Sequence, residues 1–266
     1  MDNNRPIGIL DSGVGGLTVV KEILKQLPHE KLIYVGDTAR CPYGPRPREE
    51  VKQFTFEIVD YLMTFNVKSI VIACNTATAY TLEDVKNKVD IPVIGVIYPG
   101  SIAATQNTIT GKIGVIGTEG TISSGAYEKT LKMIRPDLEV IGLACPTLVP
   151  LVEENGKHTE ENIVKVISEA LAPLKGNTID SLILGCTHYP IISEYIQQVV
   201  GENVLLISSA EETAKELTQI LEDKNLLNND LTKTDNLFFT TGEYLTFKEI
   251  GEKWLGTKIE VGHINI

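Results

Sequence analysis

The chain has 266 residues and a formal charge of −11, because 24 Lys and Arg residues stand against 35 Asp and Glu residues. Hydrophobic residues make up 42% of the sequence and charged residues 22%, a mixture typical of globular rather than disordered proteins. The acidic balance, without a block rich in Lys or Arg, argues against nucleic acid or an anionic membrane as the main partner. An anionic substrate would need local groups that overcome this global repulsion.

The four cysteines are far apart in the sequence and form no Cys-x-x-Cys pair; they are Cys41, Cys74, Cys145 and Cys186. The polar residues 1–6 are not followed by an apolar signal segment, and no apolar run is long enough to span a bilayer. We therefore expect a protein of the reducing cytoplasm, with free thiols and no membrane association.

Short apolar runs alternate with helical patterns along the chain. These runs are predicted to be buried strands, at residues 7–10, 32–35, 70–73, 93–97, 113–116, 140–143, 182–184 and 204–207. Between them, residues 47–65 place Val51, Ile58 and Leu62 on one helical face. The alternation predicts an α/β protein with mainly parallel sheets covered by helices. Ligands bind such sheets at the carboxyl ends of the strands, so function should lie in the loops that follow strands.

Two parts of the sequence resemble each other. Residues 68–76 align with residues 180–188, which places Cys74 and Cys186 at equivalent positions. Residues 7–12 align in the same way with residues 113–118. A chance match of short apolar strands is the alternative, but the matching order and spacing favour one duplicated α/β unit. The sequence therefore predicts two pseudo-symmetric halves.

A domain division follows from the duplication. The second unit begins after a Pro-Gly pair at residues 99–100 and ends at the strand of residues 204–207. We expect a first domain of residues 1–98 plus 208–266, and a second domain of residues 99–207.

The C-terminal tail is expected to return to the first domain, because the second repeat is already complete. Its predicted elements are helices at residues 211–221 and 245–255 and strands at residues 237–240 and 258–261. A capping box at residues 209–212 is predicted to open the first of these helices.

A glycine-rich segment, residues 11–18, follows the first strand and opens a helix. Its freed backbone N–H groups could meet an anion at the helix N-terminus, and a structural tight turn is a simpler possibility. A dinucleotide-binding oxidoreductase is another, in which Asp37 would bind a ribose. It is disfavoured because Thr18 stands where the fingerprint needs glycine, and because Asp11 would face the pyrophosphate.

Cys74 and Cys186 each follow an apolar strand and precede hydroxyl or amide residues that begin a helix. A helix N-terminus lowers the pKa of a thiol, although a lone cysteine there is usually a buried filler. A zinc site is disfavoured because Cys186 and His188 supply only two ligands, and zinc needs more. A single nucleophilic thiol would leave the other thiol unexplained. A disulfide redox couple is unexpected in a reducing compartment. A two-base proton exchange uses both thiols, because one removes a proton from a carbon stereocentre and the other protonates the opposite face.

Five ordered motifs resemble the aspartate/glutamate racemase family, and within it the bacterial glutamate racemases. They extend over nearly the whole chain and are IGILDSGVGG at 7–16, GD at 36–37, CPYG at 41–44, ACNTA at 73–77 and GCTHYP at 185–190. The resemblance implies two α/β domains with the active site between them. It also implies a cofactor-independent interconversion of L- and D-glutamate, which supplies D-glutamate for peptidoglycan, and usually a homodimer.

The resemblance also implies roles for individual residues. Cys74 would act on the D-enantiomer and Cys186 on the L-enantiomer, and Asp11, His188 and Glu153 would assist the thiols. The implied substrate contacts follow the predicted strands and are Asp11, Ser12, Tyr43, Gly44, Asn75, Thr76, Thr118, Thr121, Thr187 and His188.

Charge pairing is expected to contribute little to substrate binding. No lysine, the residue that anchors pyridoxal phosphate, and no arginine lies inside these motifs, although Arg40 directly precedes Cys41. Backbone N–H groups, hydroxyls and the Asn75 amide are therefore expected to hold the carboxylates.

A racemase of aspartate or another amino acid is the nearest alternative function. Cys145 is predicted to be structural. Some family members associate with DNA gyrase, but no residue of this sequence specifies such a partner.

Overall fold

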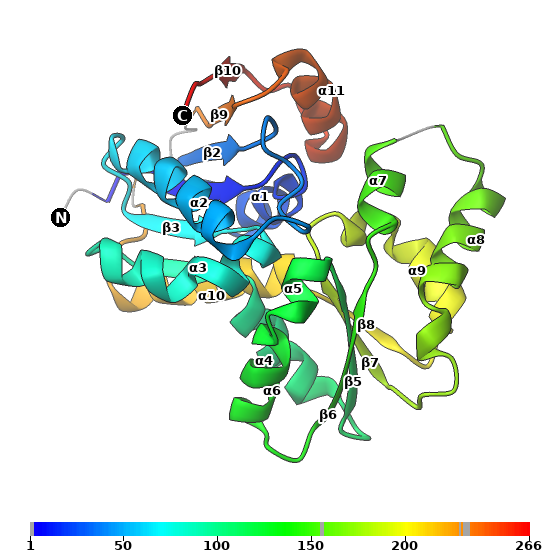
Figure 1. Cartoon of the computed structure of the whole chain (residues 1–266). Helices are drawn as coiled ribbons and strands as arrows, with labels where there is room; N and C mark the ends of the chain where they lie inside the picture. The colour runs from blue at the N-terminus through cyan, green and yellow to red at the C-terminus, as the bar shows by residue number, and fades with distance from the viewer. Residues whose placement is uncertain (1–2, 155–156, 229, 231–234) are drawn as a thin grey trace.

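The computed structural model describes residues 3–154, 157–228, 230 and 235–266. Two parallel sheets lie in two separate parts of the molecule (Figure 1). The α/β class expected from the alternation of apolar runs and helical patterns is confirmed.

The first sheet has, within the described residues, the strand order β10-β9-β2-β1-β3-β4. Its strands are β1 (Ile7–Asp11), β2 (Leu32–Gly36), β3 (Ser69–Ile72), β4 (Val93–Gly95), β9 (Leu237–Thr240) and β10 (Val261–His263). The second sheet has the order β6-β5-β7-β8. Its strands are β5 (Lys112–Gly117), β6 (Glu139–Ala144), β7 (Ser181–Gly185) and β8 (Leu205–Ser208).

Helices connect the strands and cover the sheets. Those next to the first sheet are α1 (Leu17–Gln26), α2 (Arg48–Met63), α3 (Asn75–Lys88), α10 (Ser209–Asp223) and α11 (Tyr244–Leu255). Those next to the second are α4 (Ile97–Asn107), α5 (Glu119–Ser123), α6 (Ala126–Ile134), α7 (Leu148–Glu153), α8 (Glu160–Ala170) and α9 (Ser193–Val200), with short 3₁₀ helices η1 (Ala172–Leu174) and η2 (Tyr189–Ile192). In the described part of the chain, no helix has both the length and the apolar character needed to cross a membrane.

Each inner strand is buried on both faces, which explains its uninterrupted apolar sequence. In β1, Ile7 and Ile9 pack in a cluster with residues of α1 and α10. Leu10 points to the opposite face and packs with residues of α2. Side chains of a strand alternate between faces, so one short run contributes to two cores.

The two sheets share one strand order. In the first sheet β2-β1-β3-β4 are neighbours, and in the second β6-β5-β7-β8 occupy the same places. This agreement matches the sequence repeat, because β1 corresponds to β5 and β3 to β7. Cys74 follows β3 and Cys186 follows β7, so the two thiols lie at equivalent ends of inner strands.

The tail adds two strands to the first sheet, because β9 pairs with β2 and β10 pairs with β9. The last strand begins at Val261 rather than at residue 258. The predicted strand at 93–97 is shorter, since the chain enters α4 at Ile97. The Pro-Gly pair at 99–100 therefore lies in the first turn of a helix, where proline is tolerated.

The predicted capping box at residues 209–212 is wrong. Helix α10 begins at Ser209, and its N-cap residue, Ser208, makes no side-chain capping bond. The Ser209 hydroxyl is used instead in a hydrogen bond with Tyr127, a residue of α6 in the other half of the molecule.

Candidate active site

A small cavity lies where the carboxyl ends of the two sheets meet. Its walls come from both halves and consist of Ser12, Cys41, Pro42, Tyr43, Gly44, Cys74, Asn75, Thr76, Thr118, Val149, Cys186, Thr187 and His188. The cavity volume is about 20 Å³, close to the room that one water molecule needs. The structure thus brings both predicted thiols to one closed space, together with most of the predicted substrate contacts.

Cys74 is the N-cap residue of α3, and its Sγ accepts a hydrogen bond from the Ala77 N–H at 3.4 Å. Burial raises the pKa of the Cys74 thiol to about 12, and the nearby carboxylate of Asp11 adds to this, whereas the Ala77 N–H opposes it. The helix N-terminus thus lowers the pKa of this thiol, as expected, through the Ala77 N–H. The N–H contribution is present but smaller than the effect of burial.

Cys186 has a different neighbour. It is followed by the 3₁₀ helix η2 rather than directly by an α-helix, and its Sγ lies 3.7 Å from His188 Nδ1. The other ring nitrogen, Nε2, lies 3.0 Å from Glu153 Oε1. The predicted assistants His188 and Glu153 thus form a chain that ends at Cys186.

His188 is held in its charged form. Burial lowers the pKa of His188, but hydrogen bonds to Cys186 and Glu153 raise it more, to about 10. An imidazolium carries an N–H on both nitrogens, so it can donate to the sulfur and to the carboxylate at once. The ring of Trp254, from α11, packs edge-on against His188 with a centroid distance of 6.2 Å.

The glycine-rich segment encloses the carboxylate of Asp11. Asp11 Oδ1 accepts a hydrogen bond from the Gly13 N–H at 2.9 Å, and the Gly16 N–H also donates to this side chain. Thr187 Oγ1, from the other half, donates to Oδ2 at 3.4 Å. Burial raises the pKa of Asp11 although these bonds and the charge of His188 oppose the rise. The N–H groups expected to meet an anion therefore do so, but the anion is Asp11 itself.

Gly15 is required by a close approach between the halves. A Cβ at this position would lie 2.3 Å from Thr187 Oγ1 and 2.6 Å from the His188 ring. Thr18 Oγ1 also donates to the Thr187 carbonyl at 3.0 Å. The space that a dinucleotide phosphate would need is thus filled by the loop after β7.

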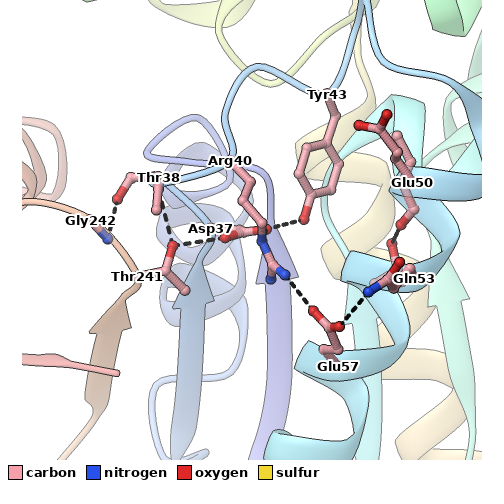
Figure 2. Close-up of polar contacts among 12 residues, drawn as sticks. Asp37, Thr38, Arg40, Tyr43, Glu50, Gln53, Glu57, Thr241 and Gly242 are labelled. Carbon is pink, nitrogen blue, oxygen red and sulfur yellow. Dashed lines mark hydrogen bonds and ion pairs between the residues drawn. The ribbon is translucent and has the colours of Figure 1, made fainter. Parts of the chain in front are cut away.

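Asp37, which the nucleotide interpretation assigned to a ribose, is a buried structural centre (Figure 2). It accepts hydrogen bonds from Arg40 Nε at 2.7 Å, from Thr241 Oγ1 at 2.7 Å and from the Tyr43 hydroxyl. Arg40 is further paired with Glu57. The Tyr43 hydroxyl is therefore directed at Asp37 rather than at a ligand, and the guanidinium next to Cys41 is already neutralised.

The segment held by Asp37 continues to Gly44, which touches the second half. The Gly44 carbonyl accepts from the Gly120 N–H at 2.9 Å, and a Cβ at Gly44 would lie 2.7 Å from Thr118 Cβ. Thr118 also bonds the hydroxyl of Thr76 at 2.8 Å and that of Thr121 at 3.0 Å. Three predicted contact residues thus form one hydroxyl cluster at the cavity.

Sequence reasoning missed four residues that shape the site: Pro42, Tyr127, Val149 and Trp254. Pro42 and Val149 line the cavity, and the hydroxyl of Tyr127 donates to Asn75 Oδ1 at 2.7 Å. Tyr127 and Leu131 lie one helical turn apart and pack in the same core cluster. The position of Tyr127 in the sequence therefore indicated only a core residue. Cys145 is buried in another core cluster, and its sulfur donates to the Leu143 carbonyl at 3.7 Å.

The arrangement suits proton transfer at a carbon atom of a small anion. Two thiols line the cavity, one beside a carboxylate and one beside an imidazolium. Among the described residues that form the walls there is no Lys or Arg, so hydroxyl and N–H donors are left to bind an anion. In the described part of the chain, no three His, Cys, Asp or Glu side chains are grouped as a metal site would require.

Comparisons with known proteins agree with one another. The Asp/Glu/Hydantoin racemase family matches residues 7–217. A glutamate racemase of Bacillus cereus is 55% identical over 265 residues, covering 99% of this chain and 98% of that protein. Glutamate racemase isoform RacE1 from Bacillus anthracis superposes with a TM-score of 0.97 at 50% identity, covering 99% of this chain and 98% of that one. The glutamate racemase of Francisella tularensis, solved in complex with D-glutamate, has a TM-score of 0.92 at 36% identity, covering 99% and 98%.

Proposed function

The chain belongs to the Asp/Glu/Hydantoin racemase family, and on that premise we propose that it interconverts L- and D-glutamate by a two-thiol proton transfer. The observation that carries the proposal is the pair Cys74 and Cys186, which follow equivalent strands and line one cavity. A pseudo-symmetric pair of acid/base groups suits a reaction whose substrate and product are mirror images. The substrate is taken from the relatives, which are glutamate racemases at 50–55% identity.

In the L-to-D direction, Cys186 removes the α-proton and Cys74 donates a proton to the opposite face. The imidazolium of His188 lies 3.7 Å from the Cys186 sulfur, close enough to donate a hydrogen bond to it. The pKa of Cys74, raised to about 12 by burial and by Asp11, keeps that thiol protonated near neutral pH, as an acid must be. In the D-to-L direction the two thiols exchange roles.

The protons of one turnover balance between the two sulfurs. The Cα–H bond breaks and its proton goes to Cys186, while the S–H bond of Cys74 breaks and its proton goes to the carbanion. The site ends the turnover with Cys186 as the thiol and Cys74 as the thiolate. A proton exchange with solvent must then restore the starting state before the next L-enantiomer reacts.

Stabilisation of the carbanion depends on fixed donors. An amino-acid α-proton is far less acidic than a thiol, so negative charge that develops on the substrate needs preorganised partners. The Asn75 amide, the hydroxyls of Thr76 and Thr118, Ser12 and Gly44 line the cavity. The Thr121 hydroxyl supports this lining through hydrogen bonds with Thr76 and Thr118. These groups hold the glutamate carboxylates, and no cofactor takes part in the proposed reaction.

The enzyme supplies D-glutamate for peptidoglycan, acts in the cytoplasm and works as a homodimer; these parts of the proposal derive from the family resemblance. The division into residues 1–98 plus 208–266 and residues 99–207 is supported by sheet membership, since β9 and β10 join the first sheet and β5 to β8 form the second. The cavity then lies between the two domains.

Incubation of purified protein with L-glutamate, followed by circular dichroism or chiral chromatography, tests the activity. The expected result is a racemic mixture, formed without added pyridoxal phosphate or metal. In heavy water, the D-glutamate formed should carry solvent deuterium at the α-carbon. Retention of the original proton would contradict the two-thiol scheme.

A parallel assay on aspartate separates the nearest alternative. Two thiols would serve any amino acid, so the specificity must come from the distance between the carboxylate-binding groups. Faster turnover of aspartate than of glutamate would replace the proposed substrate and leave the chemistry unchanged.

A further inference from the structure

The two polar atoms of the Asn75 amide differ in their hydrogen bonding: the oxygen has a partner and the nitrogen, among the described residues, has none. Asn75 is 2% exposed and lines the cavity. Its Oδ1 accepts a hydrogen bond of 2.7 Å from the Tyr127 hydroxyl. Its Nδ2, which is also buried, has no hydrogen-bond partner within the described part of the chain. An unpaired buried N–H group is costly and rare in folded proteins, so the amide nitrogen is open to an acceptor that enters the cavity.

The chemistry of the missing acceptor is narrow. A carboxylate accepts hydrogen bonds and donates none, so it can pair with an NH₂ group but not with the oxygen of the same amide. If Asn75 turned by half a rotation about its last bond, it would present Oδ1 to the cavity and repel a carboxylate. The orientation of this amide therefore decides between attraction and repulsion.

Tyr127 fixes that orientation from the other half of the molecule. It lies on α6, and its ring packs in a core cluster with Leu131 and Ile183, so it cannot easily turn away. Ser209, at the start of α10, hydrogen bonds to the same hydroxyl. Burial raises the pKa of Tyr127, so the hydroxyl keeps its proton and stays a donor. The Tyr127 hydroxyl donates to Oδ1, which leaves Nδ2 as the end of the amide that is free for an acceptor in the cavity.

We infer that Tyr127 is a positioning residue for substrate binding: it holds the Asn75 amide so that Nδ2 donates to a carboxylate of the amino-acid substrate. Tyr127 itself does not line the cavity and touches neither thiol in the proposed mechanism. The inference rests on the proposed function, because it takes a dicarboxylic amino acid as the ligand.

The variant Tyr127→Phe removes only the hydroxyl. We expect KM for both glutamate enantiomers to rise about tenfold, which corresponds to one lost charge-assisted hydrogen bond of about 1.4 kcal/mol, while kcat changes less than twofold. Tyr195→Phe is the matched control, because Tyr195 is a half-buried core residue of α9. It should leave both constants unchanged.

A double-mutant cycle decides whether Tyr127 acts through Asn75. Asn75→Ala should raise KM by at least as much as Tyr127→Phe, and in the Asn75→Ala background Tyr127→Phe should have no further effect. An equal tenfold rise in that background, or an unchanged KM in Tyr127→Phe alone, would overturn the inference. If Tyr127→Phe does not fold, Ser209→Ala takes its place. It should raise KM two- to threefold only when Asn75 is present, and an unchanged KM would again overturn the inference.

The wild-type assay in the same series separates this inference from the proposed function. A wild-type protein that does not racemise glutamate contradicts the proposed function. An active wild type with additive effects in the cycle contradicts only the role of Tyr127.

Discussion

Cys74 and Cys186 occupy equivalent positions in two halves that share a strand order, yet their surroundings differ in charge. Cys74 caps a long helix, accepts one backbone N–H and lies beside the carboxylate of Asp11. Cys186 precedes a 3₁₀ turn and lies beside an imidazolium that is held by Glu153. The duplicated fold therefore fixes where the thiols lie, whereas the residues of each loop fix the charge next to each sulfur.

This difference in neighbouring charge bears on the proposed two-thiol reaction. A two-base reaction needs one group that is deprotonated and one that is protonated at the start of each turnover. The carboxylate beside Cys74 and the imidazolium beside Cys186 give the two sides of the proposed reaction opposite neighbouring charges.

The largest expected effect comes from removing either thiol. Cys74→Ala and Cys186→Ala should each lower kcat/KM in both directions by about 10²–10⁴-fold, the usual contribution of a positioned proton-transfer group. Cys145→Ala is the control for loss of a buried thiol and should stay near wild-type activity. The two directions are compared by circular dichroism starting from each enantiomer. Near-normal turnover from Cys74→Ala or Cys186→Ala would show that the reaction does not need both thiols.

Replacing the charged neighbours of the thiols, His188 and Asp11, sharpens the comparison between the two sides of the site. His188→Asn and Asp11→Asn should each lower kcat/KM on the order of 10²-fold, toward the lower end of the range for acid/base groups. The equilibrium constant between mirror images is 1, so the fall must be equal in both directions. The two sides are separated by the primary isotope effect, which should increase for α-deuterated L-glutamate in His188→Asn and for α-deuterated D-glutamate in Asp11→Asn. The same pattern in both variants would mean that the neighbours do not serve separate thiols.

Gly15 tests the contact that brings the two sides together. In Gly15→Ala the new Cβ would collide with Thr187 and His188, so one loop must move away from the other. A shift of about 1 Å in a catalytic group can cost up to about 10²-fold in rate, and we expect a loss of at most this size in kcat. Gly142→Ala is a fair control, since its nearest contact would be Ile122 at 3.3 Å. Full activity in Gly15→Ala would show that the spacing of the loops is not critical.

The last expected effect, on stability rather than on rate, is a pH dependence that belongs to the Cys186 side. The pKa of His188 is about 10 in the folded protein, above its ordinary value of 6.5. The stabilisation is therefore complete below about pH 6.5 and is lost as the pH rises through about 10, by on the order of a few kcal/mol. Urea unfolding at pH 6.5 and 9.5 should show a fall in the free energy of unfolding that is reduced in His188→Gln. An equal fall in the variant would place the titration elsewhere.

The sheets and the positions of the thiols were open to prediction because strand and helix periods are local. Uninterrupted apolar runs marked β1, β3, β5 and β7, and the alignment of Cys74 with Cys186 anticipated their meeting. The charge states were not open to prediction, since they depend on burial and on neighbours remote in sequence. The nearness of Glu153 to His188, for example, follows from the packing of α7 on the loop after β7.

The contacts of the glycine-rich segment, residues 11–18, were also not predictable from the sequence. Its composition indicated freed N–H groups, but only the fold reveals that Asp11 occupies them. Tyr127 gave no signal beyond a core position on α6, because its partners, Asn75 and Ser209, lie 52 and 82 residues away in the sequence. Residues that act across the two halves are therefore the ones that sequence patterns miss.

The order in which the strands join has a consequence for folding. The second sheet is built from one continuous stretch, β5 to β8, whereas β2 of the first sheet must wait for β9 near the end of the chain. Contacts between distant segments form slowly, and an unpaired strand edge invites association with other chains. During synthesis, which proceeds from the N-terminus, β2 is made early and stays exposed at the edge until β9 arrives. A chain truncated before Leu237 would keep both thiols and both loops, yet it would carry a permanently open edge and be prone to aggregation.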